Sequence, residues 1–152
     1  MIAVLQIVNS ATVYADGEFS GSINRGLYIL LGVEREDTVE DAELLYNKIS
    51  KLRIFSDADG KMNLSITDIS GEALVVSNFT LNANYSHGNR PDYLASASPN
   101  EASRLYEYFV EGLSRLVKKV DTGVFGADMR SELVTDGPVT IVMNSSNLRR
   151  KK

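Results

Sequence analysis

Two short polar segments, each at the end of an apolar run, are the candidates for a functional site. The first is Ser77–Leu81 (Ser-Asn-Phe-Thr-Leu), which follows the apolar residues 73–76. The second is Asp136–Thr140 (Asp-Gly-Pro-Val-Thr), which leads into the apolar run Ile141–Met143. The end of a strand is rigid, and its unpaired backbone N–H and C=O groups can face a ligand. These segments therefore predict a site built from backbone groups as much as from side chains.

Side chains that commonly carry catalysis are scarce in this chain. It has no cysteine, which excludes disulfides, thiolate nucleophiles and Cys-based zinc sites. Its one histidine, His87, lies in a polar stretch and could act as a general base, although an exposed loop histidine is the more common outcome. No glycine-rich phosphate loop followed by a lysine is present. We expect neither a metal nor a cofactor.

Thr80 is the best-placed side-chain nucleophile, but no base is adjacent in the sequence to activate its hydroxyl. An ordinary β-branched strand residue explains Thr80 equally well. A further candidate is the segment Phe125–Met129, in which a phenylalanine and a methionine flank small residues. Such a segment can form a flat apolar slot for a base or an aromatic ring, although core packing is the simpler interpretation.

The dipeptide Gly137-Pro138 is unusual beside a strand. Glycine permits close approach of the backbone, and proline lacks an N–H, which edge strands and bulges tolerate. A Gly–Pro bond can be cis, but the trans form is favoured by about 0.5–1 kcal/mol. The residues by themselves therefore predict a trans bond.

The bulk composition predicts one domain over residues 1–152, because 152 residues with 43% apolar content can bury a substantial core. The net charge of −4 argues against a broad electrostatic grip on nucleic acid, but not against an RNA end bound in a pocket. The first residues lack the features of a signal peptide, and no apolar run approaches the roughly 20 residues of a membrane span. We expect a cytoplasmic protein with a solvated basic tail, Arg149–Lys152.

Two helices are clearly marked at their starts. Thr38 with Asp41 resembles a capping box, and Ser98 with Glu101 completes one, with Pro99 at the first helical position. Apolar residues then recur at spacings of three and four, as on the buried face of a helix.

The strands are predicted from apolar runs and turn residues. We expect strands at Ile2–Val8, Thr12–Ala15, Leu27–Val33 and Glu72–Val76, and a hairpin formed by Arg130–Val134 and Val139–Met143. Asp57–Gly60 reads as a turn rather than half a calcium loop, because no glutamate closes such a loop. Two helices and roughly seven strands predict a mixed sheet with helices on one face.

These residues together resemble the D-aminoacyl-tRNA deacylase family over nearly the whole chain. The matching pieces, in chain order, are Gln6, Gly26-Leu27, Leu31–Val33, Lys51–Phe55, Gly60–Ser65, Phe79–Leu81, Gly88, Arg90-Pro91, Thr122-Gly123, Phe125–Met129 and Gly137–Thr140. So many matches in the same order are far more specific than any one of them.

The resemblance implies a fold and an assembly. The fold would be α/β, a mixed-sheet three-layer β/β/α sandwich in a single domain, and the protein would be a two-fold homodimer. Ser77–Leu81 would correspond to the family's S-Q-F-T-L segment, and Gly137–Thr140 to its G-P-V-T segment. In the family the Gly-Pro bond is cis and reaches into the other subunit's pocket, so the resemblance implies a cis bond where the residues alone predict trans.

The resemblance also implies an activity: hydrolysis of the ester bond of D-aminoacyl-tRNA, bound by its acceptor end, with no DNA partner and no membrane. Backbone N–H groups of Phe79 and Thr80 would stabilise the oxyanion, with the substrate's 2′-hydroxyl assisting. An L side chain would strike the Gly-Pro backbone of the partner subunit, whereas glycine would escape rejection. The implied site residues are Ser77, Asn78, Phe79 and Thr80 for catalysis, Gly137, Pro138, Val139 and Thr140 for chiral selection, and Phe125, Gly126 and Met129 as walls for the terminal adenine.

The chain departs from the family pattern at three places. Asn78 replaces the usual glutamine, Ile7 replaces an arginine that helps to hold the Gly-Pro segment, and residues 82–87 replace a more basic stretch. These departures support an alternative, a weakly active or inactive homologue that binds RNA ends as a dimer. A plain dimeric nucleic-acid-binding module is a third hypothesis, which the sequence pI of about 5.0 disfavours.

Overall fold

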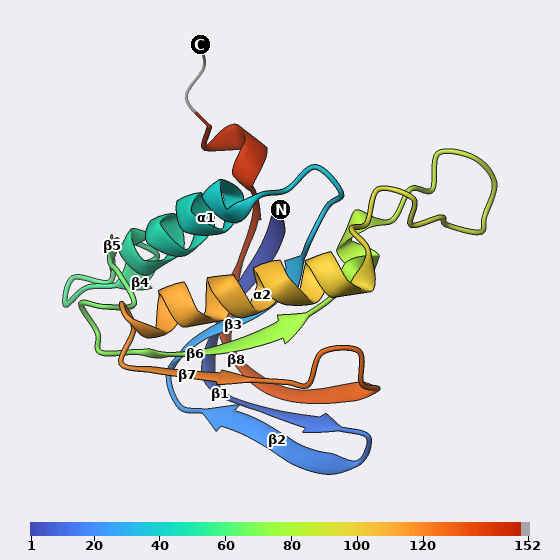
Figure 1. The fold of residues 1–152 in the computed structure, drawn as a ribbon. Coiled ribbons are helices and arrows are strands. Elements are labelled where there is room, and N and C mark those ends of the chain that lie inside the picture. The colour runs from blue at the N-terminus through green and yellow to red at the C-terminus, as the bar shows by residue number, and fades with distance from the viewer. Residues whose placement is uncertain (150–152) are drawn as a thin grey trace.

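The structure, a computed structural model, describes residues 1–149 as a curved mixed sheet with two helices packed on one face (Figure 1). In chain order the elements are β1 (Ile2–Ala15), β2 (Glu18–Ile23), β3 (Gly26–Gly32), α1 (Val39–Lys51), β4 (Phe55–Ser56), β5 (Met62–Leu64), β6 (Glu72–Ser77), the 3₁₀ turn η1 (Phe79–Asn82), α2 (Pro99–Ser114), β7 (Lys119–Thr122), β8 (Met129–Asn144) and η2 (Ser145–Asn147).

The main sheet has the strand order β2-β1-β3-β6-β7, and β8 pairs with the other edge of β1. β3, β6 and β7 run parallel to one another, and the remaining pairs are antiparallel. The Ser20 hydroxyl donates to the Thr122 carbonyl at 2.9 Å, and Lys119 Nζ donates to the Ser22 carbonyl at 2.8 Å. These bonds bring β2 against β7, so the sheet nearly closes on itself. The predicted mixed α/β class is confirmed, but one curved sheet takes the place of separate sheet layers.

Apolar side chains fill two cores, one on each side of the central strands. The larger core lies between the sheet and the helices and includes Leu5, Ile29, Leu45, Val75 and Phe109. The smaller core lies inside the curl of the sheet and includes Val8, Val13, Ile23 and Leu74. A strand that faces both cores must be apolar on both faces. This explains the continuous apolar runs of β3 and β6.

Both helices begin where the sequence predicts. The Asp41 carboxylate accepts the Thr38 backbone N–H at 2.9 Å, and the Ser98 hydroxyl accepts the Glu101 N–H at 3.4 Å. Each contact satisfies an N–H that the first turn of a helix leaves without an intrahelical partner. Neither helix in the described part of the chain is long and apolar enough to cross a membrane.

The predicted C-terminal hairpin is wrong. β8 is one strand of 16 residues that runs antiparallel to β1 along its whole length. Gln6 pairs with Thr140 and Val8 pairs with Thr135, so residues 136–139 bulge out opposite Ile7. The turn residues of this bulge imitate a hairpin in the sequence, but β1, with 14 residues, is long enough to pair with both halves of β8.

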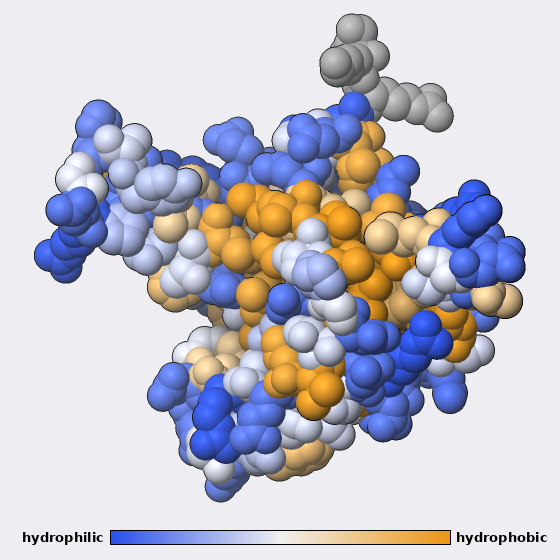
Figure 2. All heavy atoms as spheres, turned by 180° about the vertical axis from the view of Figure 1, so that it is seen from behind, coloured by the Kyte–Doolittle hydropathy of each residue, from blue (hydrophilic) through white to orange (hydrophobic). Residues whose placement is uncertain are grey.

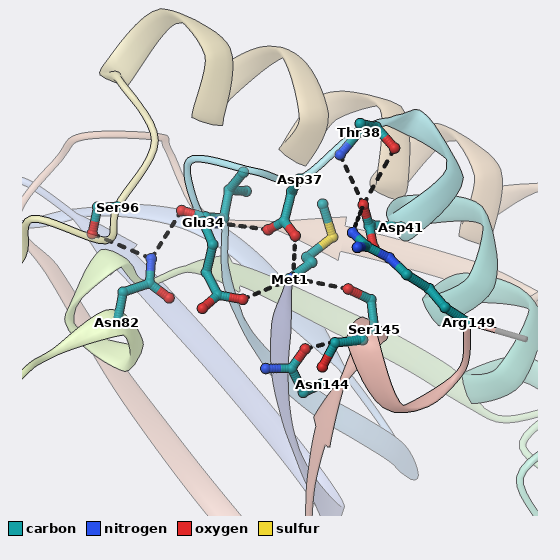
Figure 3. Close-up of polar contacts among 12 residues, drawn as sticks. Met1, Glu34, Asp37, Thr38, Asp41, Asn82, Ser96, Asn144, Ser145 and Arg149 are labelled. Carbon is teal, nitrogen blue, oxygen red and sulfur yellow. Dashed lines mark hydrogen bonds and ion pairs between the residues drawn. The ribbon is translucent and has the colours of Figure 1, made fainter. Parts of the chain in front are cut away.

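Buried charges join the start of β1, the start of α1 and the end of β8 (Figure 3). The Met1 ammonium donates to Asp37, to Glu34 Oε2 at 3.2 Å and to the Ser145 hydroxyl at 2.9 Å. Burial raises the pKa of Asp37, although the adjacent ammonium opposes this shift. Such a cluster fixes the ends of three elements at one place.

Arg149, expected in a solvated tail, is exposed but forms an ion pair that the sequence did not predict. Its guanidinium pairs with Asp41, the capping residue of α1, with both Asp41 oxygens 2.7 Å from Nη2. A planar guanidinium that grips a carboxylate at two points gains geometric specificity as well as charge attraction. The rest of the expected tail, residues 150–152, lies outside the described residues.

Candidate functional site

A pocket of about 510 Å³ opens where β3 and β6 end. Ligands of α/β proteins commonly bind beyond the carboxyl ends of parallel strands, and β3 and β6 are such a pair. Its lining brings together Ser77, Asn78, Phe79 and Thr80 with Phe125, Gly126, Ala127 and Met129. Two segments that are far apart in the sequence thus share one cavity.

Asn78 shapes the segment at the mouth of the pocket. Its backbone N–H donates to the Leu31 carbonyl at 2.8 Å, which ties the segment to β3. Its Oδ1 accepts the Thr80 backbone N–H at 3.2 Å and also the Thr80 hydroxyl. Because an N–H can donate only to the amide oxygen, the Thr80 N–H fixes the orientation of the amide. Asn78 Nδ2 therefore faces away from Thr80, and it donates to no acceptor within residues 1–149.

The backbone donors of this segment are not equivalent. The Phe79 N–H donates to no acceptor in the described part of the chain, whereas Asn78 occupies the Thr80 N–H. Phe79 and Thr80 were predicted to donate together. Among residues 1–149, the Phe79 N–H and Asn78 Nδ2 are the donors of this segment that have no acceptor, and the Thr80 N–H is already used. The Thr80 hydroxyl donates to a neutral amide, which is not a base that could activate it. This contact favours a positioning role for Thr80 over a nucleophilic one.

The wall formed by Phe125–Met129 is held from several sides. A Cβ on Gly123 would lie 2.4 Å from the Met129 sulfur, so only glycine at 123 leaves room for that side chain. The Phe125 ring packs at 5.9 Å from the Tyr106 ring, centroid to centroid. The Asp16 N–H donates to the Asp128 carbonyl at 2.8 Å and anchors the wall to the turn after β1. These contacts position Phe125 and Met129 as apolar walls of the pocket.

Sequence reasoning missed Tyr28, Tyr106 and Ser131, which also line the pocket. The Tyr106 hydroxyl donates to the Val75 carbonyl at 2.7 Å, and burial raises the pKa of Tyr106 far above its usual range. Tyr28 and Ser131 share a hydrogen bond of 2.6 Å, and burial raises the pKa of Tyr28 despite that bond. Both phenols are therefore neutral polar groups in an apolar wall. The sequence gives no signal for either role, since Tyr28 is one residue of an apolar strand and Tyr106 is one residue on the buried face of α2.

The segment Gly137–Thr140 does not line this pocket. Residues 136–138 are exposed on the bulge of β8, and a Cβ on Gly137 would meet no atom within 4 Å. Gly137 has φ +77°, a conformation that side chains disfavour, and the Thr140 hydroxyl donates to the Pro138 carbonyl at 3.3 Å. Ile7 lies opposite the bulge but is buried in the main core, so it offers no hydrogen bond to the segment.

The cis Gly–Pro bond that the resemblance implies is absent. Residues 1–149 contain no cis peptide bond, so the Gly137–Pro138 bond is trans, as the residues alone predict. The trans form is intrinsically favoured, and the exposed segment leaves open space beside the Cα of Gly137.

Two other candidate features are explained by ordinary loop and turn structure. His87 is exposed on a loop, as the more common alternative predicts. Asp57–Gly60 is a turn in which Asp57 Oδ1 accepts the Asp59 N–H at 2.9 Å and Gly60 has φ +74°. Backbone hydrogen bonds, led by that from Lys61, lower the pKa of Asp57, so this carboxylate serves the turn itself.

Comparison with known proteins points to one family. Residues 4–144 match the family described as D-Tyr-tRNA(Tyr) deacylase. A D-aminoacyl-tRNA deacylase of Sulfurihydrogenibium sp. (strain YO3AOP1) is 51% identical over 148 residues, which cover 97% of this chain and 100% of the relative. One of Thermosipho melanesiensis is 52% identical over 149 residues, which cover 97% of this chain and 99% of the relative.

Two solved structures share the fold. The c-Myc DNA Unwinding Element Binding Protein superposes with a TM-score of 0.85 at 38% identity, covering 95% of this chain and 98% of its own. A probable eukaryotic D-amino acid tRNA deacylase superposes with a TM-score of 0.82, covering 94% of this chain and 98% of its own, but at 13% identity it supports the fold alone.

Proposed function

We propose that this chain, which belongs to the D-Tyr-tRNA(Tyr) deacylase family, hydrolyses the ester bond of D-aminoacyl-tRNA and releases the D-amino acid and free tRNA. The observation that carries the proposal is that two neighbouring residues lining a pocket with apolar walls, Asn78 and Phe79, have donors without an acceptor among residues 1–149, the Asn78 Nδ2 and the Phe79 N–H. Apolar walls suit an adenine ring, and adjacent donors suit a developing negative charge.

The chemistry follows from those donors. Water attacks the ester carbonyl carbon, and the carbonyl oxygen gains the negative charge that Phe79 N–H and Asn78 Nδ2 stabilise. The carbon–oxygen bond to the ribose then breaks, and the released ribose oxygen takes a proton. The pocket lining holds no histidine and one carboxylate, Asp128. The ribose hydroxyl next to the ester, on the substrate itself, therefore carries the proton between the water and the leaving oxygen.

Chiral selection is proposed to come from a second copy of the chain. The outer edge of β8 pairs with no strand among residues 1–149, and Val134 and Val142 on it are 56% and 72% exposed. The face opposite the helices carries a broad group of hydrophobic side chains (Figure 2). An edge strand and an apolar face of this kind invite an interface between copies.

In such a two-fold dimer, Gly137-Pro138 of each copy enters the pocket of the other. Its carbonyls hold the substrate's ammonium group, a D side chain points out of the pocket, and an L side chain collides with the backbone. Glycine has no side chain to collide, so glycyl-tRNA is also hydrolysed.

Release of D-tyrosine from charged tRNA by the purified protein, with the L-ester as control, tests the activity. We expect D-specific release, and its absence at high enzyme concentration contradicts the proposal.

Mixed dimers test the shared site. One variant, Ala97→Trp, fills the pocket. The other lacks Gly137 and Pro138, but the residues of β8 on both sides of the deletion can still pair with β1. Each homodimer should be inactive. Random exchange should restore about a quarter of the wild-type activity, since about half of the dimers are mixed and each of these has one intact site. The matched control pairs Ala97→Trp with Ala102→Trp, which both block the pocket, and it should restore nothing. Mixed dimers that form without recovery contradict a shared site.

A binding protein without turnover is the second candidate. Ile7 favours it, because the bulge lacks the arginine that supports it in the family, and one structural relative is named for binding DNA. Tight binding of uncharged tRNA without any D-specific release would support this alternative. The net charge of −4 counts against a DNA-binding role.

A further inference from the structure

An aromatic lip borders the mouth of the pocket. The Phe79 side chain is 60% exposed, and its ring meets that of Tyr93 edge to face at 5.0 Å between centroids. Phe79 begins η1, and Tyr93 belongs to the segment that follows η1 and projects as a loop before α2 (Figure 1). A phenylalanine with most of its surface in water contributes little to the core, and its ring is accessible to a ligand.

The base of this loop is fixed where it carries Tyr93. Asn84 and Asp92 exchange two backbone hydrogen bonds of 2.9 Å each. The Arg35 guanidinium donates to the Leu94 carbonyl at 2.6 Å, and the Arg35 N–H donates to the Ala95 carbonyl at 2.8 Å. Tyr93 lies between these two attachments, so its ring is held against Phe79 before any ligand arrives.

On the basis of the proposed function, we propose that Phe79 and Tyr93 form a stacking platform for the unpaired nucleotides that precede the terminal adenosine of the charged tRNA. The platform continues from the pocket, since Phe79 both lines the pocket and contacts Tyr93. A single strand whose last base enters the pocket must pass this lip, and unpaired bases stack on exposed aromatic rings.

Charge near the lip favours stacking over phosphate contacts. The loop and its base carry Arg35 and Arg90, but the acidic Glu36 and Asp92 accompany them. With little net positive charge, the surface cannot depend on the release of counterions from phosphates. Binding of these nucleotides should therefore change little between low and moderate salt.

Esters of different length separate the platform from the catalytic pocket. We would compare D-tyrosyl esters of adenosine, of the trinucleotide CCA and of full tRNA, and measure kcat and KM for each. The wild-type protein should prefer the CCA ester to the adenosine ester. Tyr93→Ala should raise KM for the CCA ester about 10-fold, the scale of one lost base stack, and leave kcat unchanged. The preference for CCA should then nearly disappear.

Three further variants control for structure. Tyr93→Phe keeps an aromatic ring and should keep the preference, whereas Tyr93→Leu keeps apolar packing on Phe79 but should behave like Tyr93→Ala. Leu94→Ala changes an adjacent side chain that is 73% exposed and leaves the backbone contact with Arg35, so it should alter no parameter. Equal losses on the adenosine and CCA esters would mean that Tyr93 only supports Phe79, and they would overturn the platform.

A binding measurement separates failure of the platform from failure of the proposed function. Uncharged CCA with 2-aminopurine at its second position should lose fluorescence when wild-type protein stacks on that base, and should not with Tyr93→Ala. If no ester is hydrolysed but this quenching occurs, the function fails and the platform stands. If D-esters are hydrolysed without quenching, the platform is wrong. If sedimentation shows that Tyr93→Ala dimers dissociate more readily than wild-type dimers, the lip belongs to the contact between copies, and the platform is wrong.

Discussion

The two halves of the proposed site differ in how their own protomer holds them. Ser77–Thr80 is tied to β3 through the Asn78 N–H and closed on itself through the Asn78 side chain. Residues 136–138 stand on an exposed bulge, and the nearest support is a hydrogen bond of 3.3 Å from Thr140 to Pro138. The first half is thus preorganised by the fold of one chain. The second half can act only in the pocket of a second copy, as in the proposed dimer.

In the proposed mechanism, this difference assigns the two tasks of the reaction to different parts of the molecule. Stabilisation of an oxyanion demands donors fixed before the reaction begins, and the self-contained segment supplies them. Rejection of a substrate by collision demands only a rigid obstacle at the right place, which an interface between copies can provide. Variants in the first half should therefore change kcat, and substitutions in the second half that keep its backbone carbonyls should change chiral selectivity.

The largest expected effect is that of Asn78→Asp. Aspartate can accept the Thr80 N–H as asparagine does, so the cap and the melting temperature should hardly change. Its charge, however, lies beside the developing oxyanion and replaces a donor, so kcat should fall by about 10²–10³-fold. Steady-state kinetics on D-tyrosyl-tRNA measures this loss. Asn78→Gln, which keeps the amide, is the matched control and should stay active. A purely structural role predicts equal activity for Asn78→Asp and wild type.

Pro138→Ala should act on the other half. The substitution loosens the backbone of the bulge, so rejection of the L-ester should weaken and the ratio of D-ester to L-ester hydrolysis should fall roughly 10-fold. Hydrolysis of the D-ester should remain close to wild type. Single-turnover rates on D- and L-tyrosyl-tRNA measure both quantities. Unchanged rejection of the L-ester would refute selection by collision with this segment.

Thr80→Ala tests whether the first half works through its backbone. The Thr80 hydroxyl donates to a neutral amide, and the substitution keeps the backbone N–H that Asn78 accepts. We expect kcat to fall by less than about 10-fold, the loss of one neutral positioning hydrogen bond. Thr80→Ser should restore most of the loss. Activity at background with an intact fold would instead support a nucleophilic hydroxyl.

The sequence predicted elements whose causes are local and failed where distant chain segments decide. The caps at Thr38 and Ser98 and the turn at Asp57–Gly60 depend on residues within one helical turn, and the structure confirms them. The bulge at 136–139 looked like a hairpin because a bulge and a hairpin turn use the same kinds of residue. Only pairing of β8 with the full length of β1, over a hundred residues away, decides between them.

The candidate site shows the same limit. Ser77–Thr80 and Phe125–Met129 could each be found as motifs, but not their common cavity, which depends on the curl of the sheet. Tyr28 and Ser131 were missed because each is one more residue in a strand until the curl makes them neighbours. The division of donors between Phe79 and Asn78 was also beyond the sequence, because it depends on which way one amide turns.

The smallest effect on activity is expected from Asp41→Asn, which lies outside both halves and shows what a general loss of stability does. Burial alone would raise the pKa of Asp41, but hydrogen bonds from Arg149, Thr38 and Ser145 and the Arg149 charge together lower it. A carboxylate with a lowered pKa stabilises the fold at pH values above its unfolded pKa of about 3.9, and this contribution is lost as the pH falls through the lowered value.

At pH 7, Asp41→Asn should reduce the free energy of unfolding by about 1–2 kcal/mol, which corresponds to a fall in melting temperature of about 2–8 °C. The gap between variant and wild type should begin to narrow below about pH 4 and should close only once the pH has fallen through the lowered pKa of Asp41, where both side chains are uncharged. Thermal melts over this pH range measure it. At 25 °C kcat and chiral selectivity should stay at wild-type values, because neither half of the site contacts Asp41. A change in selectivity would mean that the position of the bulge is set through the end of β8, where Arg149 reaches α1, and not by the partner alone.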